Sequence, residues 1–205
     1  QSDEGSRGQT GSYRDGLILG MIAGNGTFAE NATGRNQAYV DIWEDDFNLL
    51  DTVGKAVISM MTEVPAENNR DYGEPVWSDQ TVAVGSKQKK RMGGVRLYRY
   101  LHDRLGVEDP TSIKATVPEC VWQGNREMVI GYLHGFFSTD GCPQAGGVAL
   151  KQTLSLRLSQ SGDNGLQLLR EVQQVILNFG IVSRVYAERR PAGIRLLPDG
   201  KGGKA

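Results

Sequence analysis

Two polar residues end two copies of one short sequence pattern. Residues 16–26 match residues 131–141, with glycine at the first, fifth and last places of both copies. The tenth place holds Asn25 in the first copy and Asp140 in the second. Oxygen atoms are the ligands that hard cations prefer, and a helix C-terminus adds partial negative charge that favours a cation. We therefore expect a cation site where the copies meet, with these candidate ligands: Asp140, Asn25, Gly24 and Thr139.

Each copy is expected to form a buried helix, because it is apolar nearly all round. Glycine inside a helix costs roughly 1 kcal/mol relative to alanine, so the internal glycines need a structural reason, and close packing of the two helix backbones supplies one. The glycines concerned are Gly16, Gly20, Gly131 and Gly135. Gly26 and Gly141 are expected to end the helices with a positive φ. Two buried helices without any chemistry would give the same pattern.

A half-buried strand is expected after each copy. In residues 37–44, Ala38, Val40 and Ile42 alternate with mostly polar residues, and in residues 153–159 three leucines alternate with polar residues. A helix starting at Asp46 or Asp163 should follow each strand.

Further strands are expected at residues 81–84 and 182–188. This order predicts an α+β fold, a pseudo-twofold tandem repeat of an antiparallel sheet plus helices. The two sheets would flank the helix pair and form a saddle.

Length and composition are those of a soluble globular protein. The 205 residues suit one domain or two small ones, and the repeat suggests halves at 13–106 and 124–205 around a linker at 107–123. The second half is expected to lack its last strand and helix. With 39% hydrophobic and 23% charged residues, collagen-like, coiled-coil and disordered classes are excluded.

Charge and cysteine content limit the possible partners. The net charge of -1 gives no global signal for nucleic acid, so DNA binding must depend on where the charges lie. Two cysteines and two histidines make neither a disulfide framework nor a zinc site. No apolar stretch approaches the roughly 20 residues of a membrane helix, so we expect no membrane partner. The lack of a disulfide framework favours a reducing, intracellular compartment, and we expect a cytoplasmic location.

The two copies resemble the motifs of the LAGLIDADG homing endonucleases, in the form that carries two motifs in one chain. The resemblance rests on residues 16–26, on residues 125–141 and on residues 113–118 just before them. It covers nearly the whole chain from Tyr13 onward. It is nearest to endonuclease domains found inside inteins, with a ribonucleotide reductase as the suggested host.

The resemblance implies a monomer with internal pseudo-twofold symmetry that binds a long double-stranded DNA target and cuts both strands. It also implies Mg²⁺ as the cofactor, held by the residues that end the two motif helices. Asp140 matches the family's acidic position, whereas Asn25 offers an amide that binds Mg²⁺ more weakly. Three accounts stay open: a decayed endonuclease, a deliberately inactivated one, and an enzyme that tolerates the amide.

A catalytic lysine near each metal site is a further implication of the resemblance. The densest basic run is Lys87, Lys89, Lys90 and Arg91, in a stretch expected to form turns after the strand at 81–84. We take Lys90 as the candidate, so the expected catalytic residues are Asp140, Asn25 and Lys90. A solvated basic loop or a phosphate contact is the alternative.

Polar faces of the expected strands and basic residues beside these strands supply candidate DNA contacts, because such side chains read base edges and bind phosphates. These candidates are Arg35, Gln37, Tyr39, Asp41, Lys89, Thr153, Ser155, Arg157, Arg184, Tyr186 and Arg190. The same alternation would arise if these residues only faced water. The alternative functions are a catalytically inactive DNA-binding module, a maturase-like RNA-splicing cofactor, and a protein that binds another protein through its sheets.

Overall fold

The structure is a computed structural model that describes residues 10–65, 75–81, 88–145, 154–160 and 163–187. The first part of the chain contains α1 (Tyr13–Asn25), β1 (Gly26–Glu30), β2 (Asn36–Trp43), η1 (Glu44–Leu49), α2 (Leu50–Thr62), β3 (Ser78–Thr81), β4 (Gln88–Gly94), α3 (Val95–Arg99) and η3 (Tyr100–Arg104). The remainder contains η4 (Pro110–Lys114), α4 (Glu119–Trp122), α5 (Arg126–Asp140), β5 (Gly141–Ala145), β6 (Leu154–Leu158) and α6 (Asp163–Leu177).

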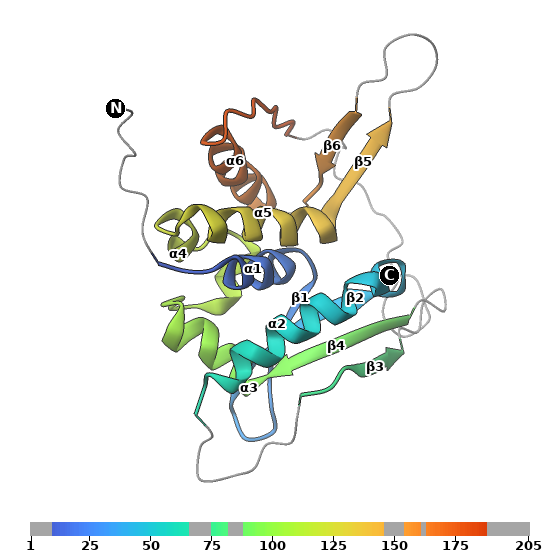
Figure 1. The fold of residues 1–205 in the computed structure, drawn as a ribbon, viewed down its shortest axis with the longest axis vertical. Coiled ribbons are helices and arrows are strands. Elements are labelled where there is room, and N and C mark those ends of the chain that lie inside the picture. The colour runs from blue at the N-terminus through green and yellow to red at the C-terminus, as the bar shows by residue number, and fades with distance from the viewer. Residues whose placement is uncertain (1–9, 66–74, 82–87, 146–153, 161–162, 188–205) are drawn as a thin grey trace.

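Two antiparallel sheets lie on either side of a central pair of helices, α1 and α5 (Figure 1). The first sheet has the strand order β1-β2-β4-β3, and the second pairs β5 with β6. In Figure 1 the β5–β6 hairpin rises from one end of α5, while the larger sheet lies below α1. The predicted α+β fold, with antiparallel sheets and helices, is confirmed.

Glycines on both helices let the backbones of α1 and α5 approach closely along their interface, which we call the seam. A Cβ atom added to Gly20 would lie 2.1 Å from the carbonyl oxygen of Tyr132, and one added to Gly135 would lie 2.2 Å from that of Leu17. Gly16 and Gly131 approach the opposite backbone equally closely. The contacts are reciprocal, and they confirm the predicted reason for these glycines.

The ends of both helices differ from the prediction. Gly26 and Gly141 have φ values of -72° and -78°, so neither takes a positive φ. Each helix passes directly into a strand, and a Cβ at these positions would lie 2.5 Å and 2.1 Å from the carbonyl oxygens of Ile22 and Phe137. Lack of space for a side chain, not backbone conformation, therefore requires glycine at both places.

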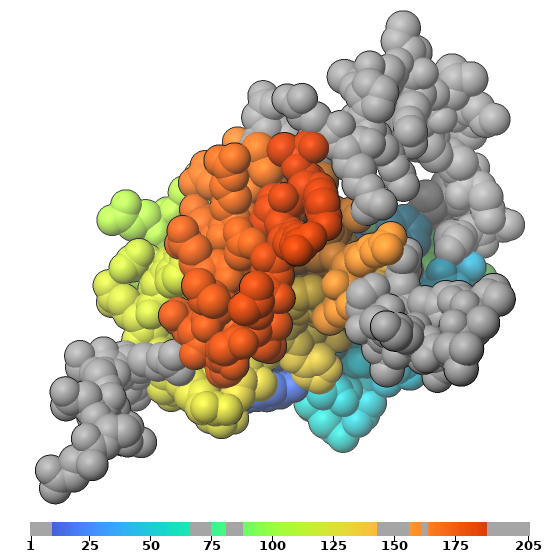
Figure 2. All heavy atoms as spheres, turned by 90° about the horizontal axis from the view of Figure 1, so that it is seen from above, coloured from blue at the N-terminus to red at the C-terminus, as the bar shows by residue number. Residues whose placement is uncertain are grey.

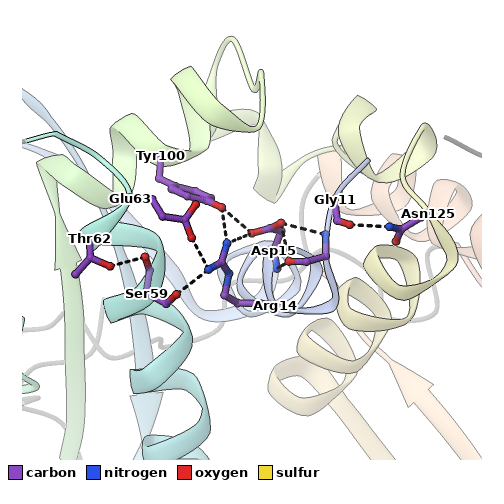
Figure 3. Close-up of polar contacts among 9 residues, drawn as sticks. Gly11, Arg14, Asp15, Ser59, Thr62, Glu63, Tyr100 and Asn125 are labelled. Atoms are coloured by element: carbon purple, nitrogen blue, oxygen red, sulfur yellow. Dashed lines mark hydrogen bonds and ion pairs between the residues drawn. The ribbon is translucent and has the colours of Figure 1, made fainter. Parts of the chain in front are cut away.

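A polar network fixes the start of α1 (Figure 3). Ser12 and Asp15 form a reciprocal capping box, in which Asp15 Oδ2 accepts from the Ser12 backbone N–H at 3.0 Å. Arg14 donates to Glu63 of the segment after α2 at 2.6 Å and to the Tyr100 hydroxyl at 2.7 Å. These bonds hold α1 against α2 and η3 at the end remote from Asn25.

The start of α5 is tied to the start of α1. Asn125 accepts a hydrogen bond from the Met128 backbone N–H at 2.9 Å. Its side-chain amide donates to the carbonyl oxygen of Gly11 at 2.6 Å, a bond drawn in Figure 3. Both helices therefore begin from one anchored point.

Helix α6 covers the outer side of α5, and Figure 2 shows it as the outermost layer of that face. Its residues Leu168, Val172 and Val175 are buried in the core. Glu171 accepts a hydrogen bond from the backbone N–H of Val117, at 2.6 Å. The expected linker at 107–123 thus contains η4 and α4 and is packed against α6. No helix among the described residues is long and apolar enough to cross a membrane.

Four predicted elements differ from the structure. The basic run at residues 88–94 is strand β4, not a turn, and β3 ends at Thr81, with residues 82–84 outside the described residues. Residues 182–187 are irregular and not a strand; they follow a turn at residues 178–180, after the end of α6, in which Gly180 has φ +76°. Helical structure after β2 begins as a 3₁₀ helix at Glu44, before Asp46, and Asp46 itself has non-helical dihedral angles.

Candidate metal and nucleic-acid site

The C-terminal ends of α1 and α5 meet at one point. A Cβ added to Gly24 would lie 1.9 Å from Thr139 Oγ1 and 3.2 Å from Asp140 Cγ. Asn25 is the next residue, and both Asn25 and Asp140 are partly exposed. The structure therefore brings the four expected metal-site residues to the same end of the helix pair.

Asp140 occupies an environment that disfavours its charge. Burial raises the pKa of the Asp140 carboxyl, while a hydrogen bond from Gln160 and the charge of Lys114 act in the opposite direction. Gln160 lies just after β6 and donates its side-chain amide to Asp140 Oδ2. The second half of the molecule thus supplies an oriented carboxylate.

Lys114 lies at the corresponding end of α1. Its ammonium donates to the carbonyl oxygens of Gly24 at 2.8 Å and Gly26 at 3.1 Å, with those of Ile22 and Ala23 at 3.5 Å. Burial lowers the pKa of Lys114, and the carboxylates of Asp140 and Asp41 oppose this effect. A positive charge therefore stands at the C-terminus of α1, close enough to Asp140 to interact with it.

The polar face of the first sheet carries a compact charge cluster. Asp41 accepts from Arg91 at 2.6 Å and 2.8 Å, from Lys89 at 2.9 Å and from the Thr27 hydroxyl at 2.7 Å. Burial acts to raise the pKa of Asp41, but the bonds from Arg91, Lys89 and Thr27 outweigh it and hold that pKa below its usual value. Two cations and one carboxylate leave this cluster with net positive charge.

Aromatic rings flank the two cations. The Arg91 guanidinium lies 5.0 Å from the centre of the Tyr39 ring, and the Lys89 ammonium lies 5.4 Å from that of Trp43. The strand register puts these residues on the same face as Gln37, which is partly exposed. This face presents charged, amide and aromatic groups, which suits contact with phosphates and bases.

Two predicted site residues are placed differently. Asp41 is only 3% exposed and its carboxylate is shared by Lys89 and Arg91, so it positions these cations and is not available to a base edge. Lys90 pairs with Ile42 in the β2–β4 register and so lies on the core-facing side of the sheet. Its ammonium contacts Asp79 at 2.6 Å, on the opposite face from Lys89.

The remaining DNA-contact candidates are dispersed. Arg157 lies on β6 opposite Cys142 and is exposed, while Arg35 follows the turn between β1 and β2. Arg184 and Tyr186 lie on the irregular segment after α6, which Gln173 binds through the Ser183 carbonyl at 2.8 Å. Thr153, Arg190 and the side chain of Ser155 lie outside the described residues.

Sequence reasoning missed Lys114, Gln160 and the role of Arg91. Alternation within residues 88–94 was the available signal for Arg91, because Lys89 and Arg91 are two apart and share a face. No local pattern identifies Lys114 or Gln160, because the residues that they contact are distant in sequence.

A divalent cation fits the α5 end of the site better than the α1 end. The described residues contain no group of three or more His, Cys, Asp and Glu side chains that could hold a metal. Mg²⁺ commonly uses one or two carboxylates, with water and substrate phosphate completing its coordination. Asp140 meets that need, whereas Asn25 is neutral and the Gly24 carbonyl already accepts from Lys114.

Comparisons with known proteins agree with this architecture. Residues 127–198 match the family model for the LAGLIDADG-like domain. Over 204 residues the chain is 29% identical to ribonucleoside-diphosphate reductase NrdEB subunit alpha of Bacillus subtilis (strain 168), and equally to that of Bacillus phage SPbeta. These matches cover 99% of this chain, which spans only 18% of the length of these relatives.

Solved structures of a homing endonuclease share the fold. Mesophilic variants of I-DmoI have a TM-score of 0.51 and 16% identity, over 83% of this chain and 78% of theirs. A variant of I-DmoI in complex with its target DNA and Mn has the same TM-score and identity, over 83% and 77%. The chain thus has the fold of these homing endonuclease structures, and its residues 127–198 are similar to the LAGLIDADG-like domain.

Proposed function

We propose that this chain is a site-specific endonuclease that binds double-stranded DNA across its two sheets. Phosphodiester hydrolysis would take place at the foot of the α1–α5 pair. The observation that supports this most is the convergence of Asp140 and Lys114 at the point from which both sheets begin. DNA that lies on the polar faces of the two sheets would have its phosphate backbone next to Asp140 and Lys114.

Different side chains have different proposed roles in DNA binding and hydrolysis. Lys89 and Arg91 bind backbone phosphates, held in place by Asp41. The Lys114 ammonium stabilises negative charge that develops on the reacting phosphate. Gln160 orients the Asp140 carboxylate, the proposed ligand of Mg²⁺. When bound, Mg²⁺ would polarise the phosphate and lower the pKa of the attacking water.

A DNA-binding module without cleavage is the second candidate. Asn25 favours it, because an amide at that position removes one of the two negative charges expected at the helix ends. A maturase-like RNA-splicing role belongs to the same non-cleaving class. DNA binding that is independent of Mg²⁺, without any nicking, would support this candidate.

The relatives suggest which DNA to test. We infer that the chain is an intein-type insertion in a reductase alpha subunit, acts as a monomer with pseudo-twofold halves, and works in the cytoplasm. The proposed target is the corresponding alpha-subunit gene without the inserted segment.

The test is cleavage of plasmids that carry this gene, with Mg²⁺, by the unaltered chain and by Asp140→Asn. Asp51→Asn is the matched control, since it makes the same change at a residue 75% exposed on α2. We expect specific cutting by the unaltered chain and the control, and a loss of at least about 100-fold in Asp140→Asn. Equal cutting by all three proteins, or no DNA binding by any, would reject the proposal.

A further inference from the structure

We infer that the Lys114 ammonium takes the place of a divalent cation at the α1 half of the site. The chain would then bind one metal ion, at the Asp140 half, and not two. This inference rests on the function proposed above, because it concerns the metal ions of that same site.

The geometry at the end of α1 supports it. Lys114 Nζ has four backbone carbonyl oxygens within 3.5 Å, all from residues 22–26. The last carbonyl groups of a helix lack partners within the helix and carry partial negative charge. The Gly24 oxygen is among them, so the ammonium occupies a position that a metal ion would need in order to use this ligand.

The charges of the surrounding groups agree with this. Asn25 is neutral, so a divalent ion at the α1 end would lie beside an ammonium with no new carboxylate to compensate it. The other nearby carboxylate, Asp41, already binds Arg91 and Lys89. Asp140 therefore stands as the carboxylate that Lys114 and one metal ion would share.

A purely structural role is the competing explanation. Lysine side chains near a helix C-terminus often bond to its last carbonyl groups, and such capping stabilises the helix. Loss of stability on substitution would fit both explanations. The number of bound metal ions separates them, because a lysine that only caps the helix does not determine how many ions the site binds.

The experiment counts Mn²⁺ ions bound to the full chain by electron paramagnetic resonance, with the metal alone and no DNA. The proteins are the unaltered chain, Asn25→Asp, and Asn25→Asp combined with Lys114→Met. Lys55→Met, at a side chain 75% exposed on α2, is the control for loss of a lysine.

We expect one bound ion in the unaltered chain, in Asn25→Asp and in the control. The double variant should gain a second ion, bound at least about tenfold more tightly than any second ion in Asn25→Asp, because a unit positive charge is removed. If Asn25→Asp binds a second ion as tightly as the double variant does, the inference is overturned. Asn25→Asp retains Lys114 as a helix cap, so it would then bind the second ion with the ammonium still in place. Two ions in the unaltered chain would overturn it as well.

Asp140→Asn separates this inference from the proposed function. If Asp140→Asn keeps the bound ion, the proposed metal site is wrong whatever Lys114 does. If the ion is lost in Asp140→Asn and the double variant still binds only one, the site stands and the Lys114 inference fails.

Discussion

The two central helices pack in the same way but end in different chemistry. On α1 the last residue is the neutral Asn25, and Lys114 bonds to the terminal carbonyl groups. On α5 the last residue is Asp140, which Gln160 contacts. The packing depends on the seam glycines and not on these end residues, so the chemistry of each end can change while the fold is kept.

The seam glycines should be the least tolerant positions. A side chain at Gly20 would meet the Tyr132 backbone at 2.1 Å, so Gly20→Val should destabilise the protein by at least about 3 kcal/mol or prevent folding. Chemical denaturation measures this, with Ala29→Val on the exposed part of β1 as the control. Equal stability of the two variants would show that the seam is not closely packed.

The Asp41 cluster should contribute to stability in a pH-dependent way. Asp41→Asn should cost about 2 kcal/mol at neutral pH, because Arg91 and Lys89 lose a charged partner. The folded-state pKa of Asp41 is lowered, so its contribution is present above the unfolded pKa of about 3.9 and is lost as the pH falls through the folded value. Denaturation from pH 7 to pH 3 should show the difference between the two proteins shrinking. A difference that is constant with pH would contradict this.

The two sheet faces should contribute similarly to DNA affinity. Lys89→Gln on β4 and Arg157→Gln on β6 should each weaken DNA binding up to about tenfold and reduce the salt slope of log affinity by about one. Arg170→Gln on α6, an exposed residue of the outer layer, is the control. An effect at one sheet only would show that DNA does not span both.

The smallest effect is expected at Gln160. Its hydrogen bond favours ionised Asp140, so Gln160→Leu should raise the Asp140 pKa further. Since a metal ligand must be ionised, the acid limb of Mg²⁺-dependent cleavage should move to higher pH. Gln167→Leu on α6 should leave the pH profile unchanged. A shift to lower pH in Gln160→Leu would contradict the assignment.

Features that follow a repeat or a period in the sequence could be predicted, whereas contacts between distant segments with no shared pattern could not. The repeat predicted the helix pair and its glycine contacts, and the structure has both. The alternation of Ala38, Val40 and Ile42 predicted a half-buried strand, and all three side chains are buried. Strand β4 was missed because its core-facing positions include Lys90 and Gly94, which break the apolar alternation. Lys114 was missed because it meets Gly24 across 90 residues of chain.

We propose Asp140 as the metal ligand of a DNA endonuclease, and a change of metal preference tests this role most directly. Thiolate favours softer cations than Mg²⁺, so Asp140→Cys should cleave the target with Cd²⁺ but not with Mg²⁺. Cys142 is present in both proteins, so the unaltered chain controls for other thiol effects. Recovery of cleavage with Cd²⁺ in Asp140→Cys alone is the predicted result. Cleavage by Asp140→Cys with Mg²⁺ at the unaltered rate would contradict the account.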